Sequence, residues 1–321
     1  MAGRLHGNRR GQLCHFTYQI ICDTSSQLPA KAAGAGAQVD NPFLKDVSGV
    51  SWDDVAGLHQ AKKALQEAAV IPIRFPELFV GARKPWRGIL LYGPPGTGKS
   101  YLAQAVASEC NSSSFLSVSA ADIMGKYVGE SEQKVRQLFT AARACKPSVV
   151  FIDEIDSLCS ARSSDDSESS KRVKTEFLVQ MQGVDDTMDG VLVIAATNIP
   201  WDLDSAIRRR FEKRIYIPLP DAQARFDLIS KALAETPNSL TAADIQTLAL
   251  ETEGFSGADL SIFVRDAVMQ PVRECQAASH FSRDKDGMFT PCAPSAPSAK
   301  KMTMIQVPAS GAPFHAGARA L

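Results

Sequence analysis

The sequence lacks an excess of charge of either sign, because 35 Lys and Arg residues balance 35 Asp and Glu residues. Without a net basic field, we expect no nucleic-acid partner and no direct electrostatic attraction to an anionic membrane. The sequence also lacks an apolar run long enough to span a bilayer. Its seven cysteines are scattered, with no C-x-x-C pair and no histidine at metal-ligand spacing. This usage argues against a disulfide framework and is typical of reduced thiols in a cytoplasmic or nuclear protein.

An alternation of strand and helix patterns is present instead. Residues 1–42 are rich in Gly, Ala and Ser without a sustained hydrophobic period, so we expect a disordered leader there. In residues 43–219, apolar runs alternate with helical patterns, and strands are predicted at 88–92, 114–118, 148–152, 191–196 and 214–217. Because the runs are continuous, they indicate strands covered on both faces. This favours an α/β fold with a parallel sheet flanked by helices.

The strand patterns stop after residue 219. Helices are predicted at 221–235, 241–251 and 256–277, which indicates a second, smaller helical domain over 220–281. Residues 282–321 are rich in Pro, Ala, Ser and Gly, apart from one short apolar stretch at 302–307. We expect the end of this region to be a disordered tail.

The most specific motif follows the predicted strand 88–92. It matches the phosphate-binding pattern G-x-x-x-x-G-K-[ST] and precedes a helix predicted to begin at Lys99. Glycines let such a loop wrap around phosphates, while Lys99 can reach the β- and γ-phosphates and Ser100 can ligate Mg²⁺. A plain Gly/Pro turn is the alternative, but the complete match and its flanks favour a nucleoside triphosphate site. The predicted binding residues are Gly93, Pro94, Pro95, Gly96, Thr97, Gly98, Lys99 and Ser100.

Two carboxylates follow the predicted strand 148–152. Asp153 can hold Mg²⁺ through water, opposite Ser100. Glu154 can orient the water that attacks the γ-phosphate, or accept a proton from it. A pair of surface acids at a strand end is the alternative, but the phosphate loop in the same sequence favours the catalytic interpretation.

Polar residues near the last two predicted strands complete the candidate site. Asn198 could hydrogen-bond the attacking water or the γ-phosphate, although Asn is also common as a simple turn residue. Arg209 and Arg210 belong to a basic run that could stabilise charge on the phosphate oxygens in the transition state. A solvent-exposed basic face is the alternative for this run.

Taken in chain order, these motifs resemble those of an AAA ATPase. The resemblance implies a P-loop NTPase large domain with a small helical domain, and ATP and Mg²⁺ as cofactors. It also implies that Asn198 is the first sensor, and that Arg209 and Arg210 are arginine fingers that enter the site of a neighbouring subunit. A ring of identical subunits, usually a hexamer, follows from that arrangement. Ala56, Gly257 and Ala258 look like parts of the segments that contact adenine.

Further segments are highly similar to the vacuolar protein sorting ATPases that disassemble ESCRT-III polymers; they are 51–58, 174–181, 197–201, 204–212 and 266–271. Over residues 44–308, this resemblance implies an ATP-driven disassembly motor with ESCRT-III subunits as its substrate. It also implies a cytoplasmic protein that partners recruit to endosomal membranes. Two alternatives stay open. Related ATPases such as katanin and spastin sever microtubules, and a chain that binds ATP without assembling would be an inert interaction protein.

Lys126, Tyr127 and Val128 occupy the position of the family's first pore loop. An aromatic side chain on a glycine-flanked loop could grip an extended polypeptide, although Tyr127 could also pack beneath the following helix. The family typically carries Trp at this position. The family also begins with a three-helix domain that docks on ESCRT-III tails, which residues 1–42 do not resemble, and contains a β-domain that we expect to be partial over 282–321.

Overall fold

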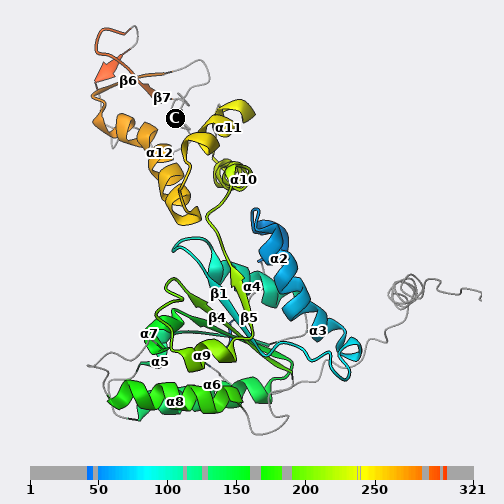
Figure 1. Ribbon diagram of the computed structural model, residues 1–321. Helices are drawn as coiled ribbons and strands as arrows, with labels where there is room; N and C mark the ends of the chain where they lie inside the picture. Colours follow the sequence, from blue (N-terminus) through cyan, green and yellow to red (C-terminus); the bar gives the residue numbers. More distant parts are fainter. Residues whose placement is uncertain are drawn as a thin grey trace, which may run out of the picture. The chain divides into compact units, whose positions relative to one another are not determined.

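Five parallel strands form the central sheet of the protein (Figure 1). They are β1 (Gly88–Tyr92), β2 (Ser114–Ser119), β3 (Ser148–Asp153), β4 (Val191–Thr197) and β5 (Lys213–Tyr216), in the order β2-β3-β4-β1-β5. β1, β3 and β4 are buried along almost their whole length, which explains their continuous apolar sequences. The predicted parallel α/β fold is therefore confirmed.

The computed structural model describes residues 42–45, 50–110, 114–124, 129–159, 168–182, 190–236, 238, 240–283, 289–296 and 299–301. All of them belong to one compact unit that begins at Pro42. The predicted leader, apart from Pro42, and the apolar stretch at 302–307 lie outside the described residues. Of the helices in the described ranges, none is long and apolar enough to cross a membrane.

Helices cover both faces of the sheet (Figure 1). Consecutive residues of a strand point to opposite faces of the sheet and enter different cores. In β1, Leu90 packs in one core with Phe139 and Phe177, whereas Leu91 packs in the other core with Leu102. The elements that contribute to the first core are α5 (Ala120–Ile123), α6 (Glu130–Ala144), α7 (Ile155–Cys159), α8 (Glu168–Gln182) and α9 (Ser205–Arg210). The elements on the other side are α2 (His59–Leu65), η2 (Gln66–Val70) and α4 (Lys99–Glu109). The short segments η1 (Trp52–Asp54), α3 (Ile71–Arg74) and η3 (Pro76–Leu78) complete this part.

Three helices form a separate small core after the sheet. They are α10 (Ala222–Leu233), α11 (Ala242–Glu251) and α12 (Gly257–Ala277), and Ile229, Leu260 and Val264 are buried between them. Each helix begins with a side-chain cap, from Asp221, Thr241 and Ser256 respectively. Such residues fix helix starts because they satisfy backbone N–H groups that have no partner within the helix.

A small antiparallel sheet follows α12. It consists of β6 (His280–Arg283), β7 (Phe289–Pro291) and β8 (Lys300–Lys301), in the order β7-β6-β8. The sequence analysis expected a partial β-domain over 282–321 but assigned no individual strand within 280–301, because these segments are short and polar and their pairing is only visible in the folded chain.

Candidate nucleotide-binding site

The phosphate loop joins β1 to α4 through a backbone that three glycines make possible. Gly93, Gly96 and Gly98 have φ values of +155°, +72° and +83°, a region that other residues adopt rarely. A Cβ atom at Gly93 would lie 2.1 Å from the carbonyl oxygen of Ile217, and one at Gly96 would lie 2.6 Å from Ser256 Oγ. The loop is therefore packed too closely for a side chain at either position.

Lys99, the first residue of α4, is buried beneath this loop. Its Nζ donates to the carbonyl oxygens of Gly93 at 3.0 Å and of Pro94 at 2.7 Å. Burial lowers the pKa of Lys99, and the negative charges of Asp153 and Asp156 oppose that shift. The side chain thus places a cationic donor where the loop would hold phosphate oxygens.

Ser100 and Asp153 meet although they are 53 residues apart in the sequence. Ser100 Oγ donates to Asp153 Oδ2 at 2.5 Å, which joins the first turn of α4 to the end of β3. These two oxygens are the hard ligands that Mg²⁺ prefers, and they leave room in its coordination for water and phosphate oxygens. In the described ranges, no group of three or more His, Cys, Asp or Glu side chains could hold a metal ion by themselves. The pair therefore fits a magnesium ion that arrives with a nucleotide.

Glu154 follows β3 in a left-handed backbone conformation with φ of +52°. A non-glycine residue in this region costs about 1–3 kcal/mol. Two hydrogen bonds hold the turn: the backbone N–H of Glu154 donates to Asp153 Oδ1 at 2.9 Å, and its carbonyl oxygen accepts from the N–H of Ser157 at 2.9 Å. The turn ends the strand abruptly and leaves the Glu154 side chain exposed at the carboxyl edge of the sheet.

The remaining predicted polar groups lie on neighbouring elements. Asn198 comes directly after β4, the strand between β3 and β1, and is half-buried. Arg209 and Arg210 end α9; Arg209 is exposed, and Arg210 Nε is buried without a hydrogen-bond partner in the part of the chain that the structure describes. Lys126, Tyr127 and Val128 lie outside the described residues.

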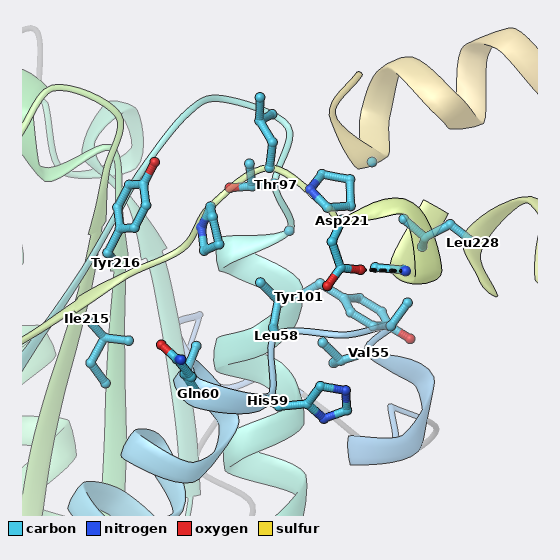
Figure 2. Close-up of a pocket in the computed structure, with 18 of the residues that line it drawn as sticks. Val55, Leu58, His59, Gln60, Thr97, Tyr101, Ile215, Tyr216, Asp221 and Leu228 are labelled. Carbon is cyan, nitrogen blue, oxygen red and sulfur yellow. Dashed lines mark hydrogen bonds between the residues drawn. The ribbon is translucent and has the colours of Figure 1, made fainter. Parts of the chain in front are cut away.

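A pocket of about 1010 Å³ opens beside the phosphate loop (Figure 2). Six of the predicted nucleotide-binding residues line it: Ala56, Gly96, Thr97, Gly98, Gly257 and Ala258. The backbone N–H of Ala258, at the start of α12, donates to the carbonyl oxygen of Gly96 at 3.1 Å. The small helical domain therefore closes one side of the pocket and contacts the loop directly.

The sequence analysis did not predict two tyrosine side chains that line this pocket, Tyr101 and Tyr216. Tyr101 rises from α4 on the same side as Val55 and Leu58, and Tyr216 comes from the end of β5 (Figure 2). Burial, followed by the charge of Asp54, raises the pKa of Tyr101, so its hydroxyl stays protonated. Tyr101 lies two residues after Lys99 in the predicted helix, and this short separation from the phosphate loop could have indicated that it lies near the site.

Comparison with known proteins matches both parts of the fold. Residues 89–219 match the ATPase family associated with various cellular activities (AAA), and residues 242–286 match the AAA+ lid domain. The solved AAA domain of FIGL-1 in complex with ADP is 43% identical, with a TM-score of 0.66 over 73% of this chain and 78% of that chain. The chain belongs to the AAA family. Nucleotide binding is accordingly expected of this AAA chain, and α11 and α12 lie in the range that matches the AAA+ lid.

Two AAA proteins with longer sequences show which members of the family this chain resembles. Vacuolar protein sorting-associated protein 4B of Mus musculus is 57% identical over 282 residues, which cover 84% of this chain and 64% of the relative. The katanin p60 ATPase-containing subunit A1 of Arabidopsis thaliana is 52% identical over 245 residues, which cover 74% of this chain and 46% of the relative. This AAA chain therefore spans somewhat less than two thirds of the length of the vacuolar sorting relative.

Proposed function

We propose that this AAA chain hydrolyses ATP with Mg²⁺ and uses the energy to disassemble ESCRT-III polymers. The observation that carries the proposal is the hydrogen bond between Ser100 and Asp153 beside the buried Lys99 of the phosphate loop, with Glu154 one residue beyond Asp153. A nucleotide-binding site needs the first three, whereas a hydrolytic site also needs a base beside the attacking water.

The side chains divide the chemistry among them. Lys99 donates to phosphate oxygens, and Ser100 and Asp153 hold Mg²⁺, which neutralises phosphate charge when it is bound. Glu154 accepts a proton from the attacking water, and the Asn198 amide orients that water or the γ-phosphate. Ala56, Gly257 and Ala258 bind the base side of the nucleotide, in keeping with their position in the pocket lining.

Arginine fingers from a second copy of the chain complete the site in this proposal. Arg209 is exposed at the end of α9, and no described contact ties it to the phosphate loop of its own chain. A planar cation supplied by a neighbour would stabilise the charge that develops on the phosphate oxygens. The functional form would then be a ring, for which we propose a homo-hexamer.

The proposed substrate follows from similarity. The vacuolar sorting relative is 57% identical to this chain and the katanin relative is 52% identical, so ESCRT-III polymers are the first candidate and microtubules the second. We propose that Lys126, Tyr127 and Val128 form the pore loop that grips the substrate. The protein would act in the cytoplasm and reach endosomal membranes through protein partners.

Phosphate release measured across a range of protein concentrations tests the motor. Specific activity should rise as rings form, and Glu154→Gln should bind nucleotide normally but hydrolyse it at least about a hundredfold more slowly. Sedimentation of assembled ESCRT-III polymers, with ATP and with the Glu154→Gln variant as control, then tests the substrate.

Each result has a defined meaning. A flat, near-zero rate at every concentration would contradict the ATPase proposal and support an inert ATP-binding protein. Normal hydrolysis with intact ESCRT-III polymers would contradict only the substrate. Shortening of stabilised microtubules in a parallel assay with ATP would then favour the katanin-like function.

A further inference from the structure

Asp156 and Thr197 form a hydrogen-bonded bridge beside the candidate catalytic groups. Asp156 lies in the first turn of α7, two residues after Glu154, and Thr197 is the last residue of β4. Thr197 is 1% exposed. Its hydroxyl donates to Asp156 Oδ1 at 2.6 Å. The bridge therefore links the ends of two segments that each carry a predicted catalytic side chain.

The same hydroxyl also holds the backbone beyond the strand. The N–H of Ile199 donates to Thr197 Oγ1 at 3.0 Å. A threonine hydroxyl has one proton and two lone pairs, so donation to Asp156 leaves a lone pair free for Ile199. Donation to a carboxylate also polarises the hydroxyl and strengthens it as an acceptor. Asn198 lies between Thr197 and Ile199, so the residues on both sides of Asn198 are held in place.

The helix that carries Asp156, α7, is packed against the core. The neighbours of Asp156 in α7, Ile155 and Leu158, are buried in the core. β3 and β4 are adjacent parallel strands with Ile152 opposite Ala195, so their carboxyl ends lie side by side at the same edge of the sheet. The backbone that carries Asn198 is consequently fixed relative to the turn that carries Glu154.

We propose that Asp156 and Thr197 are positioning residues for ATP hydrolysis, a role that rests on the proposed function. Neither residue acts on the nucleotide in this role; both act by holding Asn198 at its working position relative to Glu154. Loss of the bridge would let Asn198 move. A small displacement of a group that orients a reactant lowers the rate of the chemical step more than it lowers nucleotide affinity.

Substitutions at Thr197 test this role more cleanly than substitutions at Asp156. The charge of Asp156 also acts on Lys99, where it opposes the effect of burial on the Lys99 pKa. Replacement of Asp156 would therefore change two properties of the site. Thr197→Val removes only the hydroxyl and keeps the shape of the side chain, whereas Thr197→Ser keeps the hydroxyl and removes a methyl group.

The experiment measures kcat by phosphate release and the Kd of a fluorescent ADP analogue on the full chain. Thr197→Val should lower kcat by about tenfold to a hundredfold while the Kd stays within about threefold of wild type. Thr197→Ser should keep kcat within about threefold. Thr247→Val serves as the matched control, because the Thr247 hydroxyl donates to the Ala243 carbonyl within α11, away from the site.

A double-substitution cycle separates positioning from a general structural role. If Thr197 acts through Asn198, Thr197→Val should cost little further rate in an Asn198→Ala background. Full additivity of the two effects, or equal losses in Thr197→Val and Thr197→Ser, would overturn the proposal. So would a normal kcat in Thr197→Val, or a fall in affinity as large as the fall in rate. If the wild-type chain itself hydrolyses no ATP at any concentration, the proposed function fails and the positioning role fails with it.

Discussion

Lys99 carries its charge in surroundings that disfavour it. The side chain is buried, and within the part of the chain that the structure describes it donates to backbone carbonyl oxygens of the loop. A charged donor that meets phosphate contributes about 1.5–3 kcal/mol, which corresponds to roughly tenfold to a hundredfold in Kd. The buried ammonium group of Lys99 is therefore poorly solvated and positioned to bind the phosphate oxygens of a nucleotide.

We predict that nucleotide affinity falls at alkaline pH sooner than an ordinary lysine would cause. Burial lowers the Lys99 pKa from the usual 10.5, so the ammonium loses its proton below that pH and the phosphates lose a cationic partner. Titration of a fluorescent ADP analogue from pH 7 upwards measures the effect. Lys99→Arg is the control, because Arg stays charged over this range. An equal loss of affinity in Lys99→Arg would assign the effect to another group.

The effect of the same group on folding stability has the opposite sign. Because the folded pKa of Lys99 is lowered, the unfolded chain binds more protons than the folded chain between the lowered value and 10.5. The contribution of Lys99 to the free energy of unfolding therefore increases as the pH rises through that window. Binding and stability measured together distinguish titration of Lys99 from general alkaline unfolding.

At the residue level, the sequence allowed specific predictions where a motif fixed both identity and spacing. The pattern from Gly93 to Ser100 determined the loop, and the pair Asp153–Glu154 was visible at the end of an apolar run. Asp156 and Thr197 were missed for a physical reason. Their hydrogen bond depends on β4 lying next to β3, and the strand order of a sheet is a tertiary property that neither local sequence reveals.

At the scale of whole elements, the starts of the lid helices depend on matched caps. Ser256 begins α12 and Thr241 begins α11; each accepts the N–H of an Asp three residues later, and that Asp accepts the cap's own N–H in return. The hydrogen bonds from Ser256 lower the pKa of Asp259. The cap therefore weakens when the pH falls far enough to protonate Asp259.

We predict that Ser256→Ala and Thr241→Ala each lower the free energy of unfolding by about 0.5–2 kcal/mol, as measured by urea denaturation. Only Ser256→Ala should also weaken nucleotide binding. Ser256 packs against Gly96 and begins the turn whose Ala258 N–H contacts the phosphate loop, whereas Thr241 lines no part of the pocket. Equal nucleotide affinities in the two variants would contradict this coupling.

Elements were predictable where local and tertiary demands agree. The central strands are covered on both faces, so their sequences must be continuously apolar, and the predicted ranges match within one or two residues. α6 begins at Glu130, directly after Gly129, whose φ is +89°. β6 and β7 carry no such signal; they are recognised by their pairing, in which Phe281 lies opposite Pro291.

At the scale of the whole molecule, we predict complementation between two inactive variants. Arg209→Ala should bind nucleotide but hydrolyse it at least about tenfold more slowly, because the phosphate charge loses its cationic partner. Glu154→Gln lacks the base but keeps the finger. Mixed rings would pair an intact base with an intact finger at some interfaces, so the mixture should regain part of the wild-type rate in a phosphate-release assay.

The control is each variant alone at the same total protein concentration. A mixture no more active than the sum of its components would indicate that Arg209 acts within its own chain or not at all. Rings of the Glu154→Gln variant with ATP, detected by light scattering, would show that subunits assemble even if complementation fails.

The contact between the lid and the phosphate loop joins two backbone atoms, the Ala258 N–H and the Gly96 carbonyl. No side chain contributes to this hydrogen bond, so a substitution that exchanges only the side chain at position 258 removes neither of its atoms. The side chain at position 258 could also change over evolutionary time while the bond persisted. Among single substitutions, proline at position 258 would delete the donor directly, and the first turn of a helix is where proline is best tolerated. The link between the lid and the phosphate loop therefore depends on the course of the backbone. A comparison of amino-acid sequences does not reveal it.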